Sequence, residues 1–121
     1  MTNNVIIIGR LTRDPVVKIT DAGIPVVNFT LAVERDQKNS RGEKVVDFIP
    51  VVAWRRTAEV VGEHLTKGSL CSLTGSIQTR TFETSDGIAR MMVEVHAEKV
   101  HFLSVKKVSK DEDALVEDLL D

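Results

Sequence analysis

The chain has 121 residues, of which 42% are hydrophobic and 28% charged, a size and mixture typical of one soluble globular domain and too small for two. Its first ten residues, MTNNVIIIGR, hold an apolar run of four, too short for a signal peptide or a membrane span, so we expect a cytoplasmic protein without membrane contact. The net charge of −2 argues against a nucleic-acid partner only as an average, because residues 111–121 hold six acids and no base and leave +4 on residues 1–110.

Strands are predicted in the first half of the chain from β-branched or alternating residues, in the segments 3–11, 16–20, 24–34 and 47–54. Within 24–34, the alternation directs Val27, Phe29 and Leu31 toward the core. We expect Gly9 to mark a bulge or bend, and Pro50 to mark an irregular or edge position.

One helix and a long hairpin are predicted in the second half. The spacing of Ala58, Val61 and Leu65 indicates a helix over 55–67, with Lys67 and Gly68 as its basic last turn and glycine cap. The turn ETSDG then joins the strands 70–82 and 88–103, and Phe102 of the second is expected in the core. These elements favour an all-β fold: a five-stranded OB-fold barrel with one short helix between strands 3 and 4 and a long β-hairpin. The barrel domain is expected to span residues 1–105, followed by a short, flexible acidic tail over 106–121.

Patterns for catalysis or metal binding are missing from the sequence. Of the three histidines, His64, His96 and His101, the last two are five apart on one predicted strand, so we expect them on opposite faces and unable to share a metal. Cys71 is the only cysteine and is expected to be a small buried hydrophobe in a reducing compartment. No G-x-S-x-G elbow or phosphate-binding loop occurs. We therefore expect neither an enzyme nor a cofactor.

The aromatic residues are few enough to be weighed one by one. Phe48 and Trp54 are six apart in one strand and therefore share a face. The opposite face is apolar and suits a barrel interior: Ile49, Val51 and Ala53. Phe82 precedes the hairpin turn, with Arg80 two residues earlier on the same side. Exposed rings stack on nucleobases and nearby cations bind phosphates, but the pattern alone leaves base stacking and ordinary packing both open.

Five stretches together resemble a known family. They are NNVIIIGRLTRDP, GIPVVNFTLAVER, DFIPVVAWRRTAEVVGEHLTKGS, LTGSIQTRTFETSDG and MMVEVHAEKVHFL, and they cover nearly all of residues 1–105 in order. The chain resembles the bacterial and phage single-stranded DNA-binding proteins of the homotetrameric OB-fold type. That resemblance implies an OB barrel, a homotetramer and wrapping of single-stranded DNA without sequence readout, in the cytoplasm and on the nucleoid of a bacterial cell or phage-infected host.

The resemblance also implies roles for individual residues. By position, the base-stacking residues are Phe48, Trp54 and Phe82. The basic residues along the DNA path are Lys18, Arg56, Lys67 and Arg80, to which proximity adds Arg10 and Arg55. In the loop after LAVER, where the family often has a further aromatic residue, this chain offers only charge or a guanidinium stack, from Arg35, Lys38 and Arg41.

The C-terminal end departs from the family, which commonly has a long linker and an acidic tip ending in Pro-Phe. This chain has almost no linker and ends in DEDALVEDLLD, where Leu115, Val116, Leu119 and Leu120 could form one side of a short helix. Two interpretations stay open: a solvated, disordered terminus, or a tail that docks replication and repair proteins or competes with DNA. The residues assigned to docking are Asp118, Leu119, Leu120 and Asp121.

The sequence thus predicts a non-enzymatic protein that binds and protects single-stranded DNA during replication, recombination and repair. The alternative is an OB-fold interaction module of a primosome-type accessory factor, in which strand binding is weak. Binding of RNA or an oligosaccharide on the same face is a third possibility, because stacking does not identify the sugar.

Overall fold

The computed structural model of the protein describes residues 1–104, which contain six strands and one helix. In chain order these are β1 (Val5–Leu11), β2 (Val16–Ile19), β3 (Pro25–Glu34), β4 (Val46–Trp54), α1 (Arg55–His64), β5 (Leu70–Glu83) and β6 (Ala89–Ser104). Every predicted strand is present, and so is the helix. The acidic tail predicted over 106–121, with its docking residues, lies outside the described residues.

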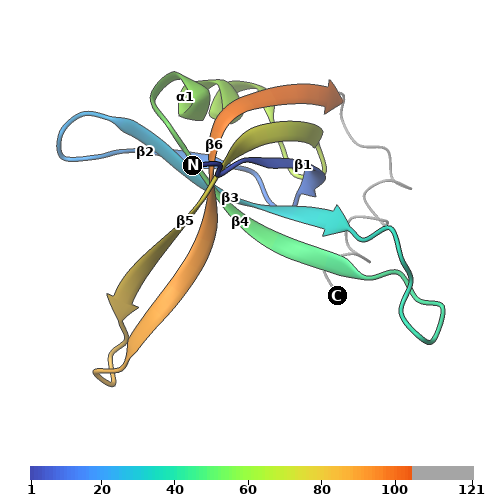
Figure 1. The fold of residues 1–121 in the computed structure, drawn as a ribbon. Helices are drawn as coiled ribbons and strands as arrows, with labels where there is room; N and C mark the ends of the chain where they lie inside the picture. Colours follow the sequence, from blue (N-terminus) through green and yellow to red (C-terminus); the bar gives the residue numbers. More distant parts are fainter. Residues whose placement is uncertain (105–121) are drawn as a thin grey trace.

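The strands form one sheet that closes on itself. Its order is β1-β5-β6-β4-β3-β2, and a further pairing of β1 with β3 joins β1, β5, β6, β4 and β3 into a ring (Figure 1). The short strand β2 extends the sheet from β3, outside the ring. Every pairing is antiparallel except that of β4 with β6. The ring has five strands, and the one short helix lies between its third strand, β4, and its fourth, β5. This arrangement agrees with the predicted OB-fold.

The core lies inside this ring and under α1. Val27, Leu31, Val51 and Leu73 from the strands of the ring are almost completely buried, and the alternation predicts this for the first three. The helix adds Ala58 and Val61 to the same cluster, and Leu65 follows it. Burial of a Val or Leu side chain contributes about 1.5–3 kcal/mol. Phe29 and Phe102 also pack in or against this cluster, so both belong to the core as predicted.

The helix ends earlier than the sequence indicates. It stops at His64, because Leu65 takes an extended conformation (φ −104°, ψ 143°) that turns its side chain into the core. Gly68 is therefore not the cap; it has a φ of +86° in a separate turn, where the Ser69 N–H donates to the Thr66 carbonyl.

Gly9 is not at a bulge, because the register of β1 with β5 is continuous from Val5 to Arg10. Its role is close approach: a Cβ at this position would lie 2.7 Å from the carbonyl oxygen of Ala32 on β3. Pro50 pairs with Thr30 in an unbroken register, so β4 is regular there. Only the next two residues of β4 pair with β6, so Pro50 precedes that ladder, which agrees with the predicted edge position.

The prediction for the two histidines on β6 is wrong. The β5–β6 register shifts between Thr74 and Gly75 so that Glu98 is skipped, and His96 pairs with Ser76 while His101 pairs with Ser72. Because Ser72 and Ser76 are an even number apart on one strand, the bulge brings both histidines to the same side. Their separation along β6, about 16 Å at 3.3 Å per residue, still prevents them from sharing a metal ion.

Candidate nucleic-acid interface

The pairing register places five of the predicted residues on one face of the sheet. Paired residues on neighbouring strands point to the same side, and so do residues two apart on one strand. Lys18 on β2 pairs with Val26 on β3, which pairs with Trp54 on β4. Phe48 is six residues from Trp54 and shares its side. The outer face thus runs unbroken from β2 to β4.

The same face continues onto the hairpin of β5 and β6. Val52, two residues from Trp54, pairs with His96 on β6, and His96 pairs with Ser76 on β5. From Ser76, steps of two along β5 lead to Arg80 and Phe82. The hairpin projects from the ring in one direction, and the end of β3 with the start of β4 projects in another (Figure 1). The face is therefore continuous but strongly curved.

The three predicted stacking residues are all partly exposed on this face. Phe48, Trp54 and Phe82 keep 44%, 43% and 40% of their surfaces accessible, whereas Val51 and Ala53 on the opposite face of β4 are buried. Part of each side chain is therefore accessible for stacking. The Arg80 guanidinium lies over the Phe82 ring, with its central carbon 5.8 Å from the ring centroid. The predicted orientation of Phe48 and Trp54 is confirmed; the base-stacking role stays a prediction.

A groove of about 710 Å³ lies beside Phe48. Lys18 and Asn28 line it from β2 and β3, and the turn after β1 contributes Arg13 and Asp14. An ammonium, a guanidinium, an amide and a ring around one groove suit a nucleotide. Sequence reasoning misses Arg13 and Asn28: the segment around Arg13 indicates only a turn, and the alternation of β3 places Asn28 without giving it a role.

Several predicted phosphate-binding cations already have protein partners. Arg35 makes a two-pronged ion pair with Asp47, with Nε–Oδ2 and Nη2–Oδ1 distances of 2.8 and 2.9 Å. Hydrogen bonding and charge raise the pKa of Arg35, and the hydrogen bond from Arg35 lowers the pKa of Asp47. Arg10 donates from Nη1 to the Gly68 carbonyl at 2.9 Å, and Arg56 contacts Glu59 at 3.2 Å. These cations are the less available ones for phosphate.

The side chains of four other predicted cations have no hydrogen-bond or ion-pair partner among residues 1–104: Lys18, Lys38, Arg41 and Arg55. Lys38 and Arg41 lie in the exposed loop between β3 and β4, whose bend is held by the Asn39 side chain. Lys67 donates its backbone N–H to Asp14 at 2.7 Å, next to the groove.

Within residues 1–104, no group of three or more His, Cys, Asp and Glu side chains is arranged to hold a metal ion. In the same part of the chain, no helix has the length and apolar character needed to cross a membrane. Cys71 is buried, and desolvation raises the pKa of its thiol to about 11. Among the described residues, the outer face thus combines aromatic side chains and cations with the amide of Asn28 and the carboxylate of Asp14 at the groove.

The strands form a closed ring, and half-exposed aromatic side chains lie with cations on its outer face. These features define a class: small OB-type domains that bind single strands by stacking and charge. Comparison with known proteins gives the family. The model of the Single-strand binding protein family matches residues 2–103, and the chain belongs to this family.

Three curated relatives illustrate the similarity. The chain is 44% identical to the single-stranded DNA-binding protein of Caldanaerobacter subterraneus subsp. tengcongensis, over 100% of this chain and 89% of that protein. It is 48% identical to single-stranded DNA-binding protein 3 of Listeria innocua, over 88% of this chain and 67% of the relative. It is also 48% identical to the single-stranded DNA-binding protein of Halalkalibacterium halodurans, over 85% of this chain and 61% of the relative.

Proposed function

We propose that this chain binds single-stranded DNA without sequence readout and protects exposed strands during DNA replication, recombination and repair. The observation that carries the proposal is the outer face on which Phe48, Trp54 and Phe82 are all partly exposed and which also bears Lys18 and Arg80. The family match and the names of the relatives, all single-stranded DNA-binding proteins, support it. They do not favour the alternative of a primosome-type interaction module.

The proposed mechanism combines two contributions. Each base stacked on an aromatic ring contributes about 1–3 kcal/mol, whatever the base. Lysines and arginines neutralise phosphates and release counterions, so the affinity falls with salt, by a slope of about −0.7 per phosphate contact on a log–log scale. No residue needs to act as an acid, base or nucleophile in this mechanism, which makes it non-enzymatic.

The test is a titration of oligo-dT against the Trp54 fluorescence, at several salt concentrations. We expect quenching and binding that weakens with salt. Replacing Trp54 or Phe82 by Ala should weaken binding by about 5- to 150-fold, the equivalent of one lost stacking contact. Because Trp54 is the only tryptophan of the chain, the variants are compared with the wild type through the fluorescence anisotropy of dye-labelled oligo-dT. Ile19→Ala is the matched control, because it removes an apolar side chain that is 64% exposed on β2 and points away from Lys18. Wild-type affinity in both aromatic variants would refute the interface. A competition with oligo-U tests the preference for DNA over RNA.

We also propose that the chain assembles into a homotetramer. Within the described residues, β1 pairs with β3 only at Arg10 and Leu11, so the edge of β1 before Arg10 is unpaired on that side. Ile6 and Ile8 on this stretch are 73% and 55% exposed, and an apolar edge strand is a template for another chain. Light scattering should give four chains per particle, and Ile6→Lys should reduce that number, whereas Ile19→Lys should not. A monomeric wild type would refute the assembly.

The acidic residues 111–121 are assigned the docking of replication and repair proteins, or competition with DNA for the basic face. Deleting these residues separates the two roles. Tighter oligo-dT binding at low salt supports competition, and unchanged DNA binding with loss of a replication or repair partner supports docking. If the deletion changes neither DNA binding nor partner binding, both roles are excluded. The activity is proposed for the cytoplasm of a bacterial cell or of a phage-infected host, since the named relatives are bacterial.

A further inference from the structure

A buried carboxylate lies on the DNA-facing side of the sheet, where the hairpin leaves the ring. Glu94 on β6 is only 6% exposed, and it pairs with Gln78 of β5, which places it on the same side as Arg80 and Phe82. Burial of a carboxylate is costly unless the group is paired and hydrogen-bonded. An anionic group on a face that binds an anionic polymer therefore needs a compensating role.

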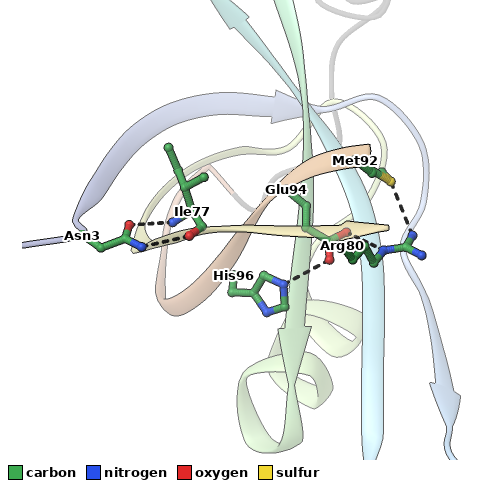
Figure 2. Close-up of polar contacts among 6 residues, drawn as sticks. All are labelled: Asn3, Ile77, Arg80, Met92, Glu94 and His96. Carbon is green, nitrogen blue, oxygen red and sulfur yellow. Dashed lines mark hydrogen bonds and ion pairs between the residues drawn. The ribbon is translucent and has the colours of Figure 1, made fainter. Parts of the chain in front are cut away.

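Glu94 divides its two oxygens between two neighbours. Arg80 donates from Nε to Oε2 at 3.4 Å, and Nε2 of His96 lies 3.1 Å from Oε1 (Figure 2). The carboxylate thus bridges the projecting half of the hairpin, which carries Arg80, and the ring, where His96 pairs with β4. Asn3 braces the same junction, because its side chain both donates to and accepts from the backbone of Ile77 at 2.9 Å.

Arg80 is held from three sides. Besides Glu94, its Nη2 lies 3.4 Å from the sulfur of Met92 (Figure 2), and its guanidinium carbon lies 5.8 Å from the centre of the Phe82 ring. The Nη1 nitrogen has no hydrogen-bond partner among residues 1–104, and the side chain is 56% exposed. The guanidinium therefore has three neighbours on the hairpin and one edge left for an incoming acceptor.

We infer that Glu94 is a positioning residue for DNA: it fixes Arg80 beside Phe82, so that a base stacked on the ring has its phosphate next to Nη1. This inference rests on the proposed function of the face. A long side chain ordered only on binding lowers the affinity, because its rotamer freedom is lost at that step. Glu94 orders Arg80 before DNA arrives, and the fork geometry of a guanidinium makes that order useful for phosphate.

The experiment turns on the sign of a charge effect. Removing a negative charge by Glu94→Gln should strengthen binding to DNA if charge alone mattered. If Glu94 positions Arg80, oligo-dT affinity should instead fall by about two- to tenfold, the usual cost of immobilising one long side chain. Glu94→Asp keeps the charge but withdraws the carboxylate by one methylene, and it should weaken binding too. Glu83→Gln is the matched control on the same hairpin, since Glu83 is exposed and its side chain has no partner among the described residues. The affinity of this variant for oligo-dT should equal that of the wild type or exceed it.

The Arg80→Ala background separates positioning from a general structural effect. In that background, Glu94→Gln should cause no further loss of oligo-dT affinity. In either single variant, the slope of affinity against salt should decrease by the equivalent of about one phosphate contact. All variants are compared at a temperature where circular dichroism shows them folded. Equal or tighter binding by Glu94→Gln, or the same loss with and without Arg80, would overturn the inference. If Arg80→Ala and Phe82→Ala both bind like the wild type, the proposed interface on this hairpin fails as well, so the two failures are distinguishable.

Discussion

Gly75 offers the sharpest test of how the hairpin is attached to the ring. It lies where the β5–β6 register shifts, and a Cβ at this position would lie 2.1 Å from the His96 carbonyl oxygen and 3.1 Å from the Ala97 Cα. Both atoms belong to the backbone, so no side-chain rotation relieves the overlap. Gly75→Ala therefore forces β5 and β6 apart at the root of the hairpin.

The magnitude follows from the size of that movement. Real Cβ atoms essentially never approach closer than 3.0 Å, so the strands must separate by about 0.9 Å in a close-packed region. We expect a loss of about 3 kcal/mol in the free energy of unfolding, at the upper end for overpacking. For a chain of 121 residues, an unfolding entropy of about 2.1 cal/mol/K per residue then lowers the melting temperature by about 12 °C.

Urea unfolding followed by Trp54 fluorescence measures this loss, at one fixed protein concentration because association contributes to stability. Gly87→Ala is the control: Gly87 has a φ of +79° in the hairpin turn, and a Cβ added there would have no neighbour within 4 Å, so only conformational strain of about 1–2 kcal/mol is expected. A loss at Gly75 no larger than that at Gly87 would refute the overlap argument.

Three further predictions follow from single residues. Arg55 begins α1 with a φ of +59°, so Arg55→Gly should stabilise the fold by about 0.5–1 kcal/mol, and Arg55→Lys should not, as scanning calorimetry can check. Because burial raises the pKa of Cys71 from 9.0 to about 11, iodoacetamide at about pH 8 should label the folded protein roughly a hundredfold more slowly than the protein in urea; equal rates would contradict the burial. Arg35 lowers the pKa of Asp47 below its ordinary value of 3.8. The ion pair therefore stabilises the fold above pH 3.8, and this stabilisation is lost as the pH falls through the lowered pKa. Asp47→Asn should then show a smaller drop in melting temperature between about pH 5 and about pH 3; an unchanged drop would exclude this contribution.

Much of the fold was predictable because sheet periodicity is a local property. The alternation over 24–34 identified Val27, Phe29 and Leu31 as core residues, and all three are buried. The same rule placed Phe48 and Trp54 together on the outer face, where they are 44% and 43% exposed. A period of two depends only on the backbone of one strand, so it survives folding wherever the strand is regular.

The rule failed where pairing between strands changes the period. His96 and His101 were expected on opposite faces, but the bulge at Glu98 brings them to the same side. The helix end was also misplaced, because Leu65 leaves the helical conformation to fill the core. The first outcome depends on how β6 pairs with β5, and the second on the packing of Leu65 in the core, so neither follows from the periodicity of one segment.

The sequence by itself determined the set of strands, the single helix, the family resemblance and the residues available for stacking and charge. Only the tertiary structure decided which cations are engaged: Arg35 with Asp47, and Arg80 with Glu94. These partners are 12 and 14 residues apart in the chain and meet only because their strands pair. The physical reason is that side-chain direction is set by local backbone geometry, whereas burial and charge pairing depend on which strands become neighbours.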